Sequence, residues 1–400
     1  MQNMRAGKER KKMRMRSAYA RMSFSGLDVT ATIHDESKSL SYIDNASGTS
    51  DTIALSMVDP TERWIGPWMP SKGDRIRGFF GVESWAFDGD NRMLDAGLFV
   101  VDSLSYSGGM DGINLSIGAV SQPADQGFMS EKRSKTWKDV TIEEIQSEIA
   151  ERYGLSYFYD AKEIKIKTKT QSKQTDSEFL AAITKEYGLA LKVYSEKIVI
   201  FDQNEYMRRP PVAIIDKMIM ESWTSSVELV GSYTGAQVSY NDPTTEECTT
   251  YIFGQNGRML KINQKCDSLA DAQMIAKAAV FEANHGNMNV SFSIMGNPSI
   301  VASQVIAITG LGRFDGNYYI DKITHSLSGN YTCKYECSNV NNENSEASEA
   351  TESADGPGTD KGGSTHEERM NAIFEGTDYA YNPSSNPSGL LDASSGAVRF

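Results

Sequence analysis

The segment "YIDNASGTSDTIALSMVD", residues 42–59, gathers oxygen-bearing side chains around Gly48, namely Asp44, Asn45, Ser47, Thr49, Ser50 and Asp51. Such a group could belong to an active site or a metal loop. A calcium loop needs an ordered run of oxygen ligands, of the D-x-D-x-D-G type with a distal Glu, and that run is missing. Asp and Asn beside a glycine, directly before an alternating strand, are typical of a turn because they hydrogen-bond the local backbone. The segment therefore predicts a structural turn.

A second glycine-rich segment, "GLGRFDG" (310–316), has the general look of a phosphate loop. It lacks the G-K-[ST] ending and joins two predicted strands instead of opening a helix. Gly310, Gly312 and Gly316 are therefore interpreted as hairpin residues.

Thiols and imidazoles are the remaining groups that could do chemistry. Cys333 and Cys337 are four residues apart in a predicted strand and face the same side, so they could bind a metal with Cys248 or Cys266. No C-x-x-C spacing supports that, and buried thiols are favoured. His325 lies at a predicted strand end, with no Ser or Cys motif pointing to a nucleophile. We expect no catalytic residue, no metal site and no cofactor.

Trp64 and Trp68 stand in the segment "RWIGPWMP", which also holds two prolines and a glycine. This composition predicts a rigid loop that either covers a β-barrel or forms part of a subunit contact. Packing against the barrel is favoured.

The bulk composition limits the classes of function. The chain has 400 residues, four cysteines and a net charge of -13, and no apolar run reaches the roughly 18 residues of a spanning helix. Few cysteines in a long chain indicate free thiols in a reducing cytoplasm, and the basic N-terminus has no apolar segment typical of a secretory signal. Residues 1–21 carry eight basic side chains, whereas 341–400 carry eleven acidic and three basic ones. The acidic body argues against specific nucleic-acid binding.

The elements that position these residues are mostly strands. Alternating patterns dominate the first 125 residues, and two helices are then predicted at 141–155 and 175–189. These helices repeat after 34 residues, and each begins with a T-x-x-E capping box, at Thr141 and Thr175. Short strands follow each helix, which indicates an α+β insertion. One further helix is predicted at 268–286, within a second strand-rich region.

The two strand-rich regions are similar to each other. "GLFVVDSL" places Gly97 and Asp102 five residues apart, and "GNYYIDKI" places Gly316 and Asp321 at the same spacing. Both follow a P-S dipeptide, a strand and a turn, and both lead into another alternating strand. The sequence thus predicts two similar β-domains in one chain. Three such chains would present six similar domains, so a trimer could join a hexamer.

These residues resemble the phage late control D family, the baseplate hub proteins of contractile tails, in the version found in Gram-positive phages and phage-tail-like bacteriocins. The carrying segments are "YIDNASGTSDTIALSMVD", "WIGPWMP" with "KGD", "GLFVVD", "DSEFLAAITKEYGLALKVYSEKIVIF" and "GNPSIVASQVIAITGLGRFDGNYYIDKITHSLSGNYTCKY". The family is similar in fold to the T-even phage tail hub and to the N-terminal region of type VI secretion spikes. The resemblance implies the following structural signature: Asp44, Asn45, Gly48, Asp51, Trp64, Trp68, Gly73, Asp74, Gly97, Asp102, Gly296, Gly310, Gly312, Gly316, Asp321 and His325.

The predicted fold class is mainly β with an α+β insertion, as two tail-hub-type β-barrels in tandem and a disordered acidic tail. The predicted divisions are a basic extension (1–16), a first β-barrel (17–127), the insertion with its internal repeat (128–203), a second β-barrel with one helix (204–340) and the acidic tail (341–400). The roles of the extension and the tail are left open.

The resemblance implies a structural, non-enzymatic hub: a homotrimeric, pseudo-sixfold adapter between the hexameric tail tube and the central spike. Expected partners are the tail tube protein, the spike protein and other baseplate or tape-measure proteins, with no membrane insertion. The protein would be made in the bacterial cytoplasm and become part of a phage tail or a headless tail-like particle. The alternatives are a cell-wall binding module, carried by 128–203, and a tail-associated wall hydrolase, which would need paired carboxylates in a cleft.

Overall fold

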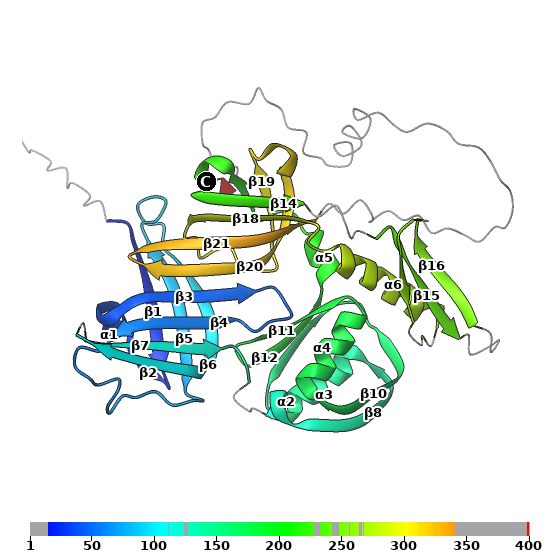
Figure 1. Ribbon diagram of the computed structural model, residues 1–400, viewed down its shortest axis with the longest axis horizontal. Coiled ribbons are helices and arrows are strands. Elements are labelled where there is room, and N and C mark those ends of the chain that lie inside the picture. The colour runs from blue at the N-terminus through cyan, green and yellow to red at the C-terminus, as the bar shows by residue number, and fades with distance from the viewer. Residues whose placement is uncertain are drawn as a thin grey trace, which may run out of the picture.

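A computed structural model describes residues 15–110, 112–123, 127–227, 233–241, 248–255, 257–263, 266 and 268–340, together with the backbone of 398–399. Most of the predicted basic extension and acidic tail lies outside these residues. Within the described part, every helix is too short or too polar to cross a membrane. The fold is mainly β, as predicted, and its strands form one large sheet and three small ones (Figure 1).

The first β-unit comprises β1 (Ser17–Phe24), β2 (Leu27–Asp28), α1 (Thr30–Glu36), β3 (Ser37–Asn45), β4 (Thr52–Val58), β5 (Arg75–Glu83), β6 (Arg92–Gly109) and β7 (Gly112–Val120). The predicted alternation in β4 is present, since Ile53, Leu55 and Met57 are buried and the residues between them are not. The helix α1 was not predicted, because its seven residues are too few to show a helical period.

The second β-unit comprises α5 (Gln203–Met207), β13 (Ala213–Asp216), η1 (Lys217–Ile219), β14 (Ser222–Val227), β18 (Met288–Met295), β19 (Val305–Thr309), η2 (Gly312–Phe314), β20 (Gly316–Ser328), β21 (Asn330–Asn339) and the short β22 (Val398–Arg399). Residues 310–315, with η2, form the hairpin between β19 and β20 that the sequence predicted for this glycine-rich segment.

The two β-units have the same strand arrangement. Hydrogen-bonded neighbours follow the order β3-β4-β7-β6-β5 in the first unit and β14-β18-β21-β20-β19 in the second. The register of β6 on β7 shifts at Asp102, and that of β20 on β21 shifts at Asp321, so the two matched aspartates are both bulge residues. Just before β5 and β19, Gly73 and Ser303 both have positive φ. The duplication indicated by the sequence is therefore present in the fold.

The two units are joined edge to edge into a single sheet. Strand β3 of the first unit pairs antiparallel with β20 of the second, with Tyr42 opposite His325. One hydrophobic core runs through both units, and the Tyr42 and His325 rings stack across the seam at 5.5 Å between centroids. Figure 1 shows the strands in succession from β14 through β20 and β3 to β7 and β6.

The insertion comprises α2 (Gly127–Ser130), β8 (Lys132–Thr141), α3 (Ile142–Arg152), β9 (Ser156–Asp160), β10 (Lys165–Thr175), α4 (Asp176–Glu186), β11 (Leu189–Tyr194) and β12 (Lys197–Asp202). Both predicted capping boxes are formed, by Thr141 with Glu144 and by Thr175 with Glu178. Each copy of the repeat also includes the strand before its helix, which the helical pattern alone did not indicate. Strands β8 and β10 pair with each other, and Asp139 and Lys173, 34 residues apart, share a positive φ.

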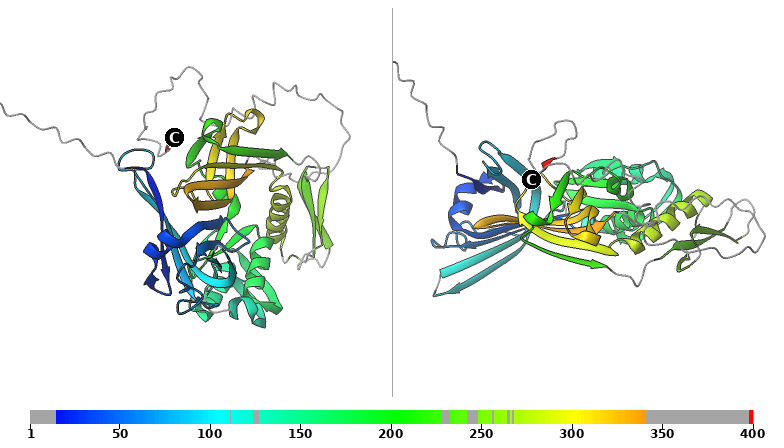
Figure 2. Two further views of the ribbon diagram at one scale, coloured as in Figure 1. Left: turned by 60° about the vertical axis from the view of Figure 1, so that its left-hand side comes forward. Right: turned by 90° about the horizontal axis from the view of Figure 1, so that it is seen from above.

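A fourth unit consists of β15 (Gly235–Asn241), β16 (Cys248–Gly254), β17 (Met259–Ile262) and α6 (Leu269–Asn284). We call it the α6 unit. The sequence analysis assigned these strands to the second β-barrel, but they form a separate sheet with its own small core. Ser268 caps the predicted helix α6, because its hydroxyl accepts from the Asp271 backbone N–H. Figures 1 and 2 place this unit on the far side of the insertion from β1.

Candidate functional site

Residues 45–51 turn the chain from β3 into β4. The Asn45 backbone N–H donates to Asp51 Oδ1 at 2.8 Å, and the Asn45 side-chain amide donates to the Ser50 carbonyl at 3.0 Å. Gly48 has φ of +74°, a conformation that glycine adopts without strain. The polar side chains of this segment thus do the local turn chemistry expected of them.

The same turn also joins three units through an ionic junction. Lys192 of β11 donates from Nζ to Asp44 Oδ1 at 2.5 Å and to the Asn45 carbonyl at 2.7 Å, and it lies 3.0 Å from Asp51 Oδ2. The second oxygen of Asp44 accepts from the backbone N–H of Ala302 at 2.8 Å. Asp44, Asp51 and Lys192 therefore hold the first β-unit, the insertion and the second β-unit together. We call these three residues the ionic junction.

The ionic junction is buried, which determines its electrostatics. Burial raises the pKa of Asp51 to about 6, against the attraction of Lys192. Burial alone would lower the pKa of Lys192, but the attraction of Asp44 and Asp51 outweighs it and raises that pKa. The Asp51 side chain is fully buried and that of Asp44 is 5% exposed, so these paired carboxylates do not face a substrate cleft. Their arrangement suits a structural role, in which they hold the two β-units and the insertion together.

The sequence analysis missed Lys192. A lysine in the middle of the apolar strand "LALKVY" (189–194) is the one signal that could have identified it, because a buried lysine needs a carboxylate partner. Two further contacts support the same attachment. The Gly48 N–H donates to the Leu191 carbonyl at 3.1 Å, and the Ser121 hydroxyl donates to the Val193 carbonyl at 3.1 Å.

Residues 59–74, which we call the tryptophan loop, connect β4 to β5. Trp64 is buried and donates from Nε1 to Glu36 Oε2 of α1 at 2.8 Å. Trp68 is 47% exposed, with the Arg63 guanidinium 4.7 Å from its ring centroid. The two tryptophans therefore differ: Trp64 packs into the first β-unit, whereas Trp68 presents a large apolar face to solvent.

His325 lies inside β20, not at a strand end. Its Nδ1 is 2.8 Å from the Tyr331 hydroxyl and 3.1 Å from Cys333 Sγ. Burial lowers the pKa of His325 to about 4 and raises that of Cys333 to about 11, so both groups are neutral at pH 7. A buried neutral thiol is a poor nucleophile. This pair fills the seam between the β-units.

The other signature residues fall into turns, bulges and close contacts. Gly97 has φ of +91°, and the Tyr194 ring of the insertion lies against it, with the Tyr194 hydroxyl donating to the Asp95 carbonyl at 2.7 Å. Gly296 lies against the ring of Tyr331. Asp74 accepts from the Ser71 N–H at 2.7 Å, across the turn that contains Gly73. Gly310 and Gly312 have positive φ in the β19–β20 hairpin, and Gly316 opens β20.

The two bulge aspartates have different partners. Asp321 accepts from the Ser338 hydroxyl at 2.5 Å and lies 2.9 Å from His285 Nε2, next to the end of α6. Asp102 is exposed and lies 3.8 Å from Lys72 Nζ. Within the described ranges, no three His, Cys, Asp or Glu side chains are grouped to hold a metal ion.

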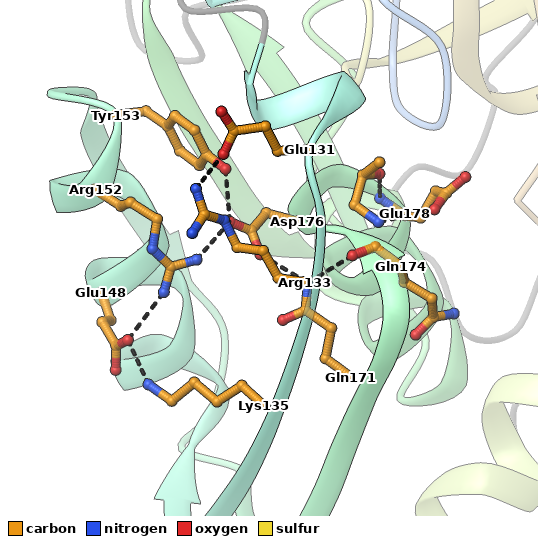
Figure 3. A network of polar contacts seen from close by, with 11 residues as sticks. Glu131, Arg133, Lys135, Glu148, Arg152, Tyr153, Gln171, Gln174, Asp176 and Glu178 are labelled. Atoms are coloured by element: carbon orange, nitrogen blue, oxygen red, sulfur yellow. Dashed lines mark hydrogen bonds and ion pairs between the residues drawn. The ribbon is translucent and has the colours of Figure 1, made fainter.

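A polar network in the insertion surrounds Asp176, the first residue of α4 (Figure 3). Asp176 Oδ2 is 2.5 Å from Arg152 Nη1 and accepts from the Tyr153 hydroxyl at 2.8 Å, while Oδ1 accepts from the Gln171 amide at 2.8 Å. Burial alone would raise the pKa of Asp176, but these hydrogen bonds outweigh it and lower that pKa. Asp176 is thus a fully partnered anion that ties α3, β10 and α4 together.

The large sheet has an open edge at β14, where the sheet ends, and another along residues 103–109 of β6. Strand β14 pairs with β18 on one side, and within the described residues nothing pairs with its other side. Residues 103–109 of β6 pair with β7, and their outer side is likewise unpaired in the described part of the chain. Trp223 and Val227 of β14 are more than 40% exposed. Open edges of this length invite pairing with another chain.

Comparison with known proteins identifies a phage protein as a relative in sequence. No protein-family model matches the chain. A probable baseplate hub protein of Escherichia phage 186 is 25% identical over 189 residues, or 46% of this chain. The match spans 45% of that protein's length, which is less than half of it.

Solved structures share the fold at low sequence identity. A tail protein from Neisseria meningitidis has a TM-score of 0.63 at 11% identity, over 80% of this chain and 96% of that one. The 43 kDa tail protein of prophage MuSo2 from Shewanella oneidensis has a TM-score of 0.61 at 10% identity, over 81% of this chain and 99% of that one. The chain therefore has the fold of phage tail proteins and, over less than half of its length, is similar in sequence to a probable phage baseplate hub protein.

Proposed function

We propose that this chain is a structural baseplate hub whose three copies close into a ring that joins a hexameric tail tube to a central spike. The tail tube protein, the spike protein and other baseplate or tape-measure proteins are its proposed partners. The proposal assigns no catalysis to the chain, because the paired carboxylates and the Cys–His pair are buried and neutral or fully partnered. In this view the hub is made in the bacterial cytoplasm and becomes part of the tail particle.

The observation that carries the proposal is a match between the pairing of β3 with β20, which we call the closed seam, and the two open edges. Strands β3 and β20 pair within the chain. The duplicated strand order makes β14 the counterpart of β3, and makes 103–109 of β6 the counterpart of the paired part of β20. Each chain therefore has one open edge of each kind. Pairing β14 of one chain with β6 of the next repeats the internal seam between chains, and such head-to-tail contacts generate rings when the rotation closes.

The strand registers within the chain fix which residues would meet. Within the chain, Thr324 pairs with Ile43. The matched bulges in β6 and β20 make Ser105 the counterpart of Thr324. The pairings of the strands between them and the edges then make Ser226 the counterpart of Ile43. Ser105 of one subunit would then lie directly opposite Ser226 of the next. Three chains in such a ring contain six similar β-units, which is the symmetry that a hexameric tube requires.

The first test is the assembly state of the full chain, alone and co-expressed with its tail tube protein. Light scattering is expected to give three times the 44.1 kDa chain mass in at least one sample. Negative-stain averages of that species are expected to show an open ring with six similar peripheral densities. A monomer in both samples would overturn the proposal.

The second test is a cysteine pair in the predicted register. The Ser105→Cys/Ser226→Cys variant, in a Cys248→Ser background, is expected to form disulfides that link the subunits covalently on oxidation. The described native thiols are buried and do not compete. The Ser107→Cys/Ser226→Cys variant is the control, because residues displaced by two along a strand are about 7–8 Å apart. Equal cross-linking of both pairs, or of neither in a proven trimer, would reject this register.

A further inference from the structure

The tryptophan loop has an apolar tip that is only about half covered by the described part of the chain. Ile65, Trp68 and Met69 are 43%, 47% and 54% exposed. The loop itself is firmly held, since Asp59 accepts hydrogen bonds from the backbone N–H groups of Trp64 and Ile65 at 3.0 Å each. A rigid loop that exposes adjacent apolar side chains is typical of a contact surface.

The second β-unit shows what covers the corresponding loop. Residues 296–304 connect β18 to β19, as the tryptophan loop connects β4 to β5. The Gly296 carbonyl accepts from Trp85 Nε1 at 2.6 Å, and the Asn297 side chain accepts from Arg92 at 2.9 Å. Both donors belong to the β5–β6 hairpin of the first unit. Across the closed seam, therefore, one unit's hairpin covers the other unit's loop.

We propose that the tryptophan loop of one subunit is covered by the β19–β20 hairpin, residues 310–315, of the next subunit. This inference rests on the proposed ring. In the duplicated arrangement, the β19–β20 hairpin is the counterpart of the β5–β6 hairpin. When β14 of one subunit pairs with β6 of another, this hairpin of the first subunit therefore lies against the tryptophan loop of the second. Leu311 and Phe314 are partly exposed on this hairpin and supply apolar surface for Trp68.

The position of the tryptophan loop agrees with a second copy as the occupant. The Tyr106 hydroxyl of β6 donates to the Trp64 carbonyl at 2.8 Å, so the loop lies directly beside the open edge of β6. A strand added to that edge brings its own unit next to the loop. The exposed apolar tip and the open edge are thus two parts of one continuous surface.

Site-specific cross-linking tests the contact. A photoreactive amino acid at position 68 of the full chain is irradiated in rings assembled from isotopically light and heavy subunits, and the cross-linked peptides are identified by mass spectrometry. Mixed light–heavy cross-links to residues 310–316 are expected. If the ring forms but residue 68 cross-links elsewhere, the inference is wrong while the proposed function stands. If no ring forms in any sample, the proposed function itself fails.

A matched pair of variants gives a second, independent readout. Trp68→Ser/Met69→Ser is expected to weaken subunit association at least tenfold, measured by dilution in mass photometry at a temperature where the monomer stays folded. Phe158→Ser is the control, because Phe158 on β9 of the insertion is also 47% exposed but belongs to neither the loop nor the open edges. Equal association of the double variant and the control would overturn the proposal.

Discussion

The closed seam and the two open edges are built on the same strand arrangement but filled with different residues. At the closed seam, Tyr42 stacks on His325, and both are fully or almost fully buried. At the open edges, the counterparts of these residues are Ser225 and Tyr106, and β14 is otherwise rich in Ser and Thr. A seam inside one chain can be filled with aromatic rings because it is never exposed after folding. An exposed edge limits its apolar surface by alternating large side chains with small polar ones, as the serines and threonine of β14 do.

The largest expected effect comes from breaking the closed seam at its ionic junction. Lys192→Met removes the cation between Asp44 and Asp51 and leaves two buried carboxylates facing each other. Losing one partner of a buried ion pair costs about 3–5 kcal/mol, so the free energy of unfolding is expected to fall by that amount in chemical denaturation. Lys197→Met on the exposed side of β12 is the control. A loss below about 1 kcal/mol for Lys192→Met would show that the junction does not hold the units together.

An intermediate effect is expected from pH, because two buried groups of the seam titrate with opposite sign. Asp51 has a pKa of about 6 in the folded chain and an ordinary value of 3.8, so its contribution to stability rises as pH falls from about 6 to 4. His325 has a pKa of about 4 against an ordinary 6.5, so its contribution is lost as pH falls from about 6.5 to 4. The two contributions partly cancel in the native chain.

Single variants separate these two contributions. Asp51→Asn is expected to make the unfolding free energy fall more steeply between pH 6.5 and 4, by up to about 1.4 kcal/mol per pH unit. His325→Phe is expected to make it fall less steeply or rise. Urea unfolding at half-unit pH intervals measures both slopes, and comparing slopes removes any constant loss of stability. Slopes that change in the same direction would contradict the assignment.

The smallest expected effect compares the two bulge aspartates. Asp321→Ala removes the acceptor for Ser338 and the partner of His285, which is expected to cost about 1–3 kcal/mol. Asp102→Ala removes an exposed carboxylate next to Lys72 and is expected to change stability by less than about 0.5 kcal/mol. Thermal unfolding of the two variants tests this difference. Equal losses would mean that both bulges depend on the carboxylate in the same way.

Local signals accounted for the parts of the fold that were predicted correctly. Thr141 and Thr175 form the expected capping boxes, because a capping box needs only residues within one turn of helix. The spacing from Gly97 to Asp102 and from Gly316 to Asp321 indicated a duplication, because a bulge at a fixed place in a strand needs the same short pattern in both copies. Within the turn at 45–51, the Asn45 side chain hydrogen-bonds the local backbone, as asparagine favours in turns.

Contacts between units could not be predicted in this way. The separate sheet of the α6 unit was assigned to the second β-barrel, because short strands with similar composition do not reveal which sheet they join. Cys333 was considered as a metal ligand, yet it lies beside His325, a neighbour that depends on the pairing of β20 with β21.

The sequence by itself determined a mainly β chain with a duplicated β-unit, a helical repeat in the insertion and a turn at residues 45–51. Each of these properties rests on short patterns within about twenty residues, where side-chain periodicity and backbone preference act directly, even where a pattern recurs farther along the chain. Only the tertiary structure decided that β3 pairs with β20, that Lys192 enters between Asp44 and Asp51, and that β14 and residues 103–109 of β6 keep open edges. Those outcomes depend on which distant surfaces exclude water together, and the packing of the whole chain selects them.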